Sequence, residues 1–199
     1  TEQIGSIEMD EVPAMIAIHG GEVIEPISLH YNKKYNLIIV HAINPGKGYE
    51  WKLADVMFDL AKQLSAKEII CLEGVGSPSS KERVFFHGRN MPKKSLKVLS
   101  GCCEPLQEGV IVGVTGAMLA KRSKIPILSL FAEAQGNGPD SHAAAGIITS
   151  LDKYIGFKLD PAPLNEQAQM FEGKLKEVVK KHDKARKIQN KKSVLSYVG

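Results

Sequence analysis

The sequence contains little cysteine and no pattern that would pair it. Only three of the 199 residues are cysteine, and two of them, Cys102 and Cys103, are adjacent. This small, odd number excludes an even-numbered disulfide framework and favours a reducing compartment, so we expect a cytoplasmic protein. No paired C-x-x-C or C-x-x-C with H-x-x-x-H spacing suggests zinc, and we expect no bound metal.

Membrane-spanning runs and the common catalytic motifs are also missing. No apolar run is long enough to span a bilayer, and no secretory signal is recognisable, so we expect no membrane partner. The segment NPGKGYEW, Asn44 to Trp51, joins a predicted strand to a predicted helix but lacks the spacing of a phosphate-binding loop. The G-x-S-x-G nucleophile elbow is absent as well. We therefore predict no catalytic residues and no cofactor.

Basic charge is concentrated near the end of the chain. Lys174 to Lys192 hold nine lysine or arginine residues against two acidic ones, a balance of +7 that leaves −3 of the total +4 to the rest. A basic segment of this kind can bind nucleic acid or form the solvated face of a charged helix. We favour the solvated face, because no aromatic side chain is interleaved for base stacking, and nucleic acid is not an expected partner.

Short apolar runs alternate with amphipathic patterns along the chain. Continuous apolar strands between helices predict an α/β domain of three layers, α/β/α, around a mostly parallel sheet. We expect one domain over residues 1–190, followed by an apolar tail over residues 191–199. The predicted strands are Met15–Ile18, Leu37–Ala42, Glu68–Leu72, Leu96–Leu99, Val110–Val112 and Ile127–Phe131; the predicted helices are Trp51–Leu64, Gly116–Lys121, Ser141–Ile155 and a long C-terminal helix from near Leu164.

Residues that could bind a ligand follow two of these strands. Glu133 ends the strand Ile127–Phe131 on the side where doubly wound sheets bind ligands. Gly113 and Gly116 open a helix and could leave backbone N–H groups free for an anion, although close packing of that helix explains them equally well. Asp140 precedes the helix Ser141–Ile155 and is predicted to be its N-terminal cap. A ligand cleft at Gly113, Gly116 and Glu133 is therefore possible from the residues alone.

The block from Gly109 to Glu172 contains a series of short motifs. They are the G-x-x-G-x-x-L element of Gly113, Gly116 and Leu119, the acid Glu133, Pro139-Asp140, Ala143–Ala144, Leu159-Asp160, and Ala168 with Glu172. In these positions the sequence resembles the proteasome assembly chaperone 2 family, above all its archaeal homologues. The resemblance covers nearly the whole chain, but the part before Gly109 matches more loosely. It implies a fold similar to the purine-nucleoside-phosphorylase type, a homo-oligomer, and no demonstrated catalysis.

The two ends of the chain depart from this family pattern. The sequence begins with Thr1, and we expect that the strand and helix with which the family begins are missing. Some archaeal members end in a hydrophobic residue, tyrosine and any residue, a sequence that docks between proteasome α subunits. Here Tyr197 is third from the end, so the register differs. The expected partner-docking residues are Leu195, Tyr197, Val198 and Gly199.

Two functions follow from these observations. The first is a non-enzymatic, oligomeric chaperone or adaptor that binds protein partners, such as proteasome α subunits or another assembly factor, through its surface and its C-terminal tail. The alternative is a small-molecule or nucleotide-binding enzyme of phosphorylase-like fold that uses the loops at Gly113–Gly116 and Glu133.

Overall fold

The computed structural model describes residues 1–10, 16–43, 48–76, 83–134, 140–159 and 166. The chain divides into two compact units, which are described separately. Unit 1 comprises Thr1–Cys71, Gly88–Met91 and Gln107–Leu128, and unit 2 comprises Leu72–His87, Pro92–Leu106 and Ser129–Gly199.

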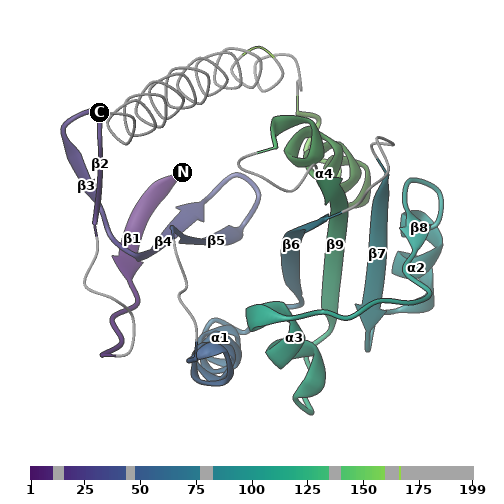
Figure 1. Cartoon of the computed structure of the whole chain (residues 1–199), viewed down its shortest axis with the longest axis horizontal. Helices are drawn as coiled ribbons and strands as arrows, with labels where there is room; N and C mark the ends of the chain where they lie inside the picture. Colours follow the sequence, from purple (N-terminus) through teal and green to yellow (C-terminus); the bar gives the residue numbers. More distant parts are fainter. Residues whose placement is uncertain (11–15, 44–47, 77–82, 135–139, 160–165, 167–199) are drawn as a thin grey trace, which may run out of the picture. The chain divides into compact units, whose positions relative to one another are not determined.

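Unit 1 contains an antiparallel sheet of three strands in the order β1-β4-β5 (Figure 1). β4 pairs with β5 along its whole length, from Ile27 opposite Ala42 to Asn32 opposite Leu37. A tight turn joins these two strands, and only an antiparallel pair can be connected so closely. The strands are β1 (Glu2–Ser6), β4 (Ile27–Asn32) and β5 (Leu37–Ala42), and β2 (Ala17–His19) forms a separate hairpin with β3 (Glu22–Ile24).

Two helices, α1 (Glu50–Gln63) and α3 (Gly113–Ala120), pack against each other in unit 1. α1 carries apolar residues at helical spacing, so one face is buried while the opposite face stays polar. Burial of this face against α3 removes apolar surface from water and so stabilises the unit. The shared core consists of Ala54, Phe58, Ala117, Met118 and Ile127, and a second cluster holds Ile27, Tyr49 and Leu53.

The other sheet has four strands in the order β6-β9-β7-β8, and most of it belongs to unit 2. It is mixed: β7 pairs with β8 in parallel, whereas the N–H of Glu133 near the end of β9 donates to the carbonyl of Arg83 just before β7. That hydrogen bond places the end of one strand beside the start of the other, as in an antiparallel pair. The strands are β6 (Ile69–Gly76), β7 (Val84–Arg89), β8 (Glu104–Pro105) and β9 (Ile127–Ala134).

Helices α2 (Lys93–Leu99) and α4 (Ser141–Ile155) contact each other in unit 2. α4 has the bounds that its sequence predicts. Asp140 accepts a hydrogen bond from the N–H of Ala143 at 3.0 Å, and Gly156 ends the helix in the left-handed region at φ 83°.

Several sequence-based predictions of the fold are wrong. The described strands form antiparallel and mixed sheets instead of one mostly parallel sheet, and β5 and β6 lie in different sheets. The predicted strand Leu96–Leu99 lies within α2, because a short apolar run fits a helix as well as a strand. Val110–Val112 forms no strand, and Val110 is 90 % exposed.

The mixed α/β fold itself is confirmed. The likeness to purine-nucleoside phosphorylases and the single domain over residues 1–190 stay predictions. The predicted C-terminal helix and the tail over residues 191–199 lie outside the described residues.

Candidate functional site

Glu133 lies near the end of β9, the most deeply buried strand of the mixed sheet. Its side chain is only 6 % exposed. Arg83, just before β7, donates two hydrogen bonds to it: Nη2 to Oε1 at 2.7 Å and Nε to Oε2 at 3.1 Å. This two-pronged geometry matches a guanidinium to a carboxylate and adds directional specificity to the charge attraction. Both carboxylate oxygens of Glu133 are therefore engaged within unit 2.

The surroundings of Arg83 strengthen this pairing. The hydrogen bonds to Glu133 raise the pKa of the Arg83 guanidinium above its ordinary value, with a smaller contribution from the charge of Glu104. The guanidinium carbon also lies 5.1 Å from the centre of the Phe85 ring, within the range of a cation–π contact. Arg83 is 40 % exposed, so one side of the ion pair faces solvent. The arrangement pairs the buried Glu133 side chain with a cation from the same unit.

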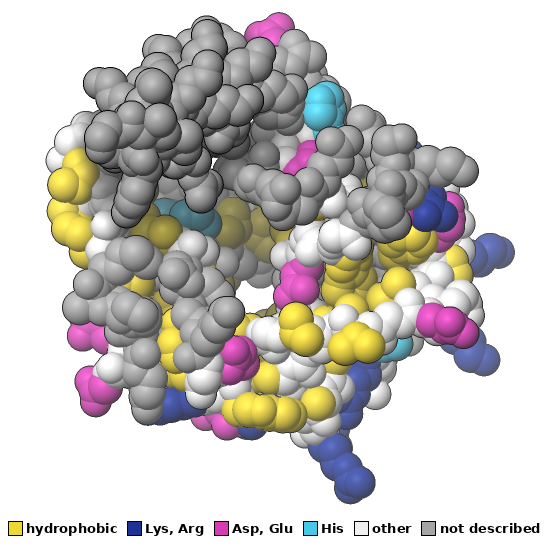
Figure 2. Space-filling model, in the orientation of Figure 1, with side chains coloured by type: hydrophobic (Ala, Val, Ile, Leu, Met, Phe, Trp, Pro, Cys, Tyr) yellow, Lys and Arg dark blue, Asp and Glu magenta, His cyan; other side chains and the backbone are white. Residues whose placement is uncertain are grey.

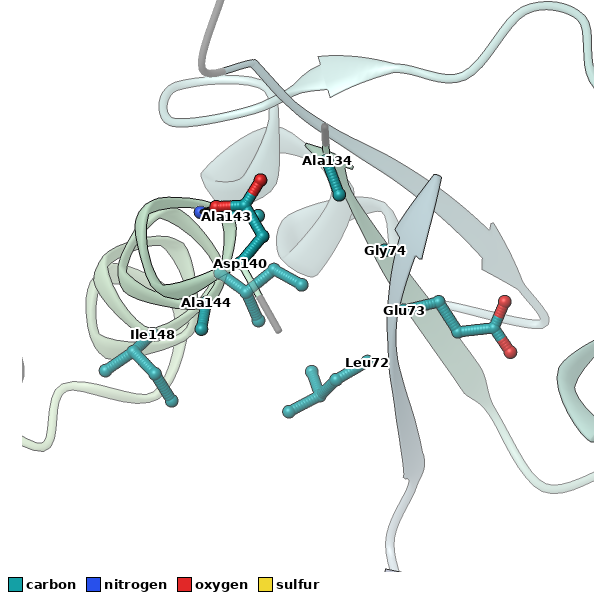
Figure 3. Close-up of a pocket in the computed structure, with 9 residues that line it drawn as sticks. Leu72, Glu73, Gly74, Ala134, Asp140, Ala143, Ala144 and Ile148 are labelled. Atoms are coloured by element: carbon teal, nitrogen blue, oxygen red, sulfur yellow. Dashed lines mark hydrogen bonds between the residues drawn. The ribbon is translucent and has the colours of Figure 1, made fainter. Parts of the chain in front are cut away.

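A pocket of about 320 Å³ lies between β6 and α4 in unit 2 (Figure 3). Figure 3 shows Leu72 and Ile148 on the pocket side, while Glu73 points away from α4. The one acidic group that lines it beside Glu73 is Asp140, whose carboxylate already caps α4. Such a lining favours apolar contact over acid–base chemistry. The lining residues are Leu72, Glu73, Gly74, Ala134, Asp140, Ala143, Ala144, Ile147 and Ile148.

Gly113 and Gly116 both lie in α3, within unit 1. Gly113 is the first residue of the helix and has a φ of 81°, a conformation that glycine adopts without strain. At Gly116, a Cβ atom would lie 2.5 Å from the carbonyl oxygen of Ile111, so the backbone approaches too closely for any side chain. Local packing thus accounts for Gly116 without a ligand. The described structure places Glu133 in the other unit, and a cleft shared by these three residues stays a prediction.

An exposed aromatic residue forms a further cluster in unit 1 that the sequence did not predict. Trp51, in the first turn of α1, is 58 % exposed. Lys121, just after α3, lies over its ring with Nζ 5.6 Å from the centroid, and the same Nζ lies 2.5 Å from Oδ1 of Asp55. Tryptophan is among the residues enriched at protein–protein interfaces relative to the rest of the surface. Helical spacing within α1 hints at Trp51 and Asp55, but no sequence pattern links them to Lys121.

The predicted docking residues Leu195, Tyr197, Val198 and Gly199 lie outside the described residues. Within the described ranges, no group of three or more His, Cys, Asp or Glu side chains could hold a metal ion. No helix in that part of the chain has both the length and the apolar character needed to cross a membrane.

Comparisons with known proteins match the chain to a family model described as the PAC2 family, over residues 1–179. A crystal structure of Pyrococcus furiosus PbaA, an archaeal homolog of proteasome-assembly chaperone, matches with a TM-score of 0.76 and 25 % identity, covering 99 % of this chain and 84 % of that one. A Thermoplasma acidophilum protein of unknown function has the same fold, with a TM-score of 0.76, 20 % identity and coverage of 94 % and 78 %. An uncharacterized protein of Methanocaldococcus jannaschii is 25 % identical over 181 residues, 89 % of this chain and 74 % of its own length.

A solved structure with a lower TM-score and lower sequence identity also has this fold. Pyrococcus furiosus PbaB, an archaeal proteasome activator, matches with a TM-score of 0.62 and 23 % identity over 82 % of this chain and 76 % of that one. The resemblance inferred from Gly113, Gly116, Glu133 and Asp140 is thereby confirmed at the level of the family. The chain belongs to the PAC2 family, and it is related to the archaeal homologues of proteasome-assembly chaperones.

Proposed function

We propose that this chain is a non-enzymatic, homo-oligomeric chaperone or adaptor of the cytoplasm that binds proteasome α subunits. The observation that carries this proposal is the likeness to PbaA, an archaeal homolog of proteasome-assembly chaperone, over 99 % of the chain. The same fold recurs in PbaB, an archaeal proteasome activator. A fold alone does not fix a function, so the proposal also rests on the surfaces of this chain.

The state of Glu133 supports a role without catalysis. A buried carboxylate needs a charge partner whether or not it takes part in catalysis, so a complete ion pair accounts for Glu133 without a substrate. Here both oxygens accept hydrogen bonds from Arg83, and Arg83 keeps its proton. The alternative of a nucleotide- or phosphate-dependent enzyme at Gly113, Gly116 and Glu133 has less support, because local packing explains Gly116 and the ion pair explains Glu133.

Two parts of the chain are suited to protein contact. Trp51 is exposed beside the ion pair of Lys121 and Asp55, and tryptophan is one of the residues that most often dominate binding energy at interfaces. The sequence also ends with the apolar residues Leu195, Tyr197 and Val198 after the basic Lys191 and Lys192. We propose that this tail fills an apolar pocket on an α subunit, with Gly199 at its end, while the lysines approach acidic groups at the rim.

Binding of the purified full chain to isolated proteasome α subunits tests this proposal. The measurement compares the full chain with a variant that lacks Val194–Gly199, and light scattering gives the mass of the free chain and of the complex. We expect the free chain to be larger than a monomer, the full chain to bind, and the shortened chain to bind more weakly. Absence of binding by both forms would contradict the proteasome assignment, and equal binding would contradict only the role of the tail.

The Glu133→Gln variant distinguishes the proposed chaperone function from the alternative enzymatic function. The amide cannot act as an acid, base or nucleophile, but it keeps the size of the side chain. We expect unchanged binding to α subunits. A saturable rise in melting temperature with nucleotides, nucleosides or phosphate that disappears in this variant would favour the enzyme instead.

A further inference from the structure

Helix α2 forms from a sequence that opposes a helix in several ways. Its N-cap is Pro92, which provides no side-chain hydrogen bond to the free N–H groups of the first turn. Lys93 and Lys94 occupy that first turn, where the partial positive charge of the helix dipole repels them, and no acidic residue is there to offset it. Lys97 adds a like charge four residues after Lys93, which disfavours the helix, but it lies in the last turn, where the dipole favours a cation. The features of the N-terminal turn are the ones that lower the stability of α2.

Lys93, Lys94 and Lys97 form what we call the lysine face. Residues three and four positions apart project from the same side of a helix, so the three ammonium groups belong to one surface. All three side chains are exposed, and none of them forms an ion pair within the part of the chain that the structure describes. Figure 2 shows separate Lys and Arg side chains projecting at the margin where Figure 1 draws α2, with acidic side chains between them.

The opposite side of α2 explains how this helix nevertheless forms. Leu99, its last residue, is fully buried, and α2 contacts α4. Tertiary packing therefore holds the backbone, as it does for most short helices in proteins. The lysine face contributes nothing to that packing. Local choices that conflict with the fold occur mainly where a surface serves a function.

We propose that the lysine face of α2 is a docking surface for an acidic surface on the protein partner, and this inference rests on the proposed binding of proteasome α subunits. Carboxylates of a partner would compensate both the mutual repulsion of the three lysines and the repulsion of Lys93 and Lys94 from the helix dipole. Exposed Val98 lies beside Lys97 and offers a small apolar contact. A protein fits this surface better than a nucleic acid, because α2 carries no aromatic residue on which bases could stack.

The test reverses the charge of the lysine face in the full chain, with K93E, K94E and K97E combined. A matched control, K33E, K67E and K124E combined, reverses three exposed lysines on other elements and changes the net charge by the same amount. We expect the α2 variant to bind isolated proteasome α subunits at least about tenfold more weakly, with steep dependence on salt, and the control to bind within about twofold of the unaltered chain. We also expect its melting temperature to stay within about 2–4 °C of the unaltered chain, because two acidic residues at the helix N-terminus stabilise it while the acidic residue that replaces Lys97 in the last turn destabilises it.

The combination of weaker binding and retained stability distinguishes docking from a structural role. Equal weakening by the control, or a melting temperature of the α2 variant lowered by clearly more than about 4 °C, would overturn the inference. If the unaltered chain does not bind α subunits, the proposed function fails, and retention on immobilised polyglutamate then tests the lysine face alone. The α2 variant should elute at clearly lower salt than the control, and coincident elution overturns the inference. Loss of retention on DNA with full retention on polyglutamate would assign the face to nucleic acid and overturn it as well.

Discussion

The close approach of α3 to the backbone of Ile111 predicts that Gly116 cannot be replaced even by alanine without loss of stability. The added Cβ would lie 2.5 Å from the Ile111 carbonyl oxygen and 3.1 Å from its carbonyl carbon. Both atoms belong to the backbone, so neither can rotate away. α3 or the segment at Ile111 must shift, and α3 carries Ala117 and Met118 into the core of unit 1.

The expected size of the effect follows from two opposing contributions. Overpacking of a closely packed region costs about 1–3 kcal/mol. Alanine stabilises a helix relative to glycine by about 1 kcal/mol. Because the clash is with backbone atoms, the upper part of the overpacking range applies, about 2–3 kcal/mol. Subtracting the gain in helix stability, we expect Gly116→Ala to lower the free energy of unfolding by about 1–2 kcal/mol, which corresponds to a melting temperature about 2–8 °C lower for a chain of this size.

Gly146→Ala in α4 provides a matched control. A Cβ at that helical position would lie 3.2 Å from Cγ2 of Val84, a side-chain atom that can move by a few tenths of an ångström. The helix-forming tendency of alanine then dominates, and we expect stability unchanged or higher by up to about 1 kcal/mol. The two substitutions, chemically identical, should differ in sign.

Urea denaturation followed by circular dichroism measures the free energy of unfolding of both variants, and the fluorescence of Trp51 reports on unit 1. This residue is the only tryptophan in the sequence and lies on α1, which packs against α3. A Gly116→Ala variant as stable as the unaltered chain would refute the packing argument. If that variant also lost a ligand-dependent rise in melting temperature, the glycine would belong to a binding site.

The remaining predictions concern the acidic and thiol groups of unit 2. Arg83→Met should lower the melting temperature more than Glu133→Gln does. The first substitution leaves a buried carboxylate without its partner, whereas the second leaves a half-exposed guanidinium that water can solvate. The reverse order of melting temperatures in calorimetry would contradict the ion pair. Asp140→Ala should cost about 1 kcal/mol in urea denaturation through loss of the α4 cap, and Asp140→Asn, which keeps an acceptor oxygen, should cost less; equal losses would argue against capping. Burial raises the pKa of Cys102 to about 11 from 9.0, so its alkylation by iodoacetamide, followed by mass spectrometry, should be slow at neutral pH and accelerate until about pH 11. An alkylation rate that levels off near pH 9 would contradict this pKa. Since the folded state disfavours the thiolate, the contribution of this thiol to the free energy of unfolding is present below pH 9.0 and is lost as the pH rises through about 11.

Local signals in the sequence predict some elements of the fold well. For α4, the sequence places an acceptor side chain at Asp140, a helical apolar pattern over the following residues, and glycine at Gly156. Each signal acts within one or two turns of the chain, and the structure has the helix at the predicted bounds. β5, at Leu37–Ala42, is likewise predicted from a single continuous run of β-branched and apolar residues.

Elements that depend on tertiary contacts are the ones the sequence does not predict. In α2, Leu96, Val98 and Leu99 resemble a strand, and burial of Leu99 beside α4 selects the helix instead. The ion pair of the candidate site joins two strands through residues that are distant in sequence, Arg83 and Glu133, and no spacing rule connects them. Glu133, near the end of β9, could therefore be recognised from the sequence, but Arg83, which forms an ion pair with it, could not.

Titration calorimetry of the full chain with isolated proteasome α subunits tests most directly the central claim, that the chain binds these subunits without using Glu133 for chemistry. The account predicts a saturable complex whose affinity is the same for the unaltered chain and for Glu133→Gln. It would be contradicted if no complex formed, or if binding to α subunits required the Glu133 carboxylate.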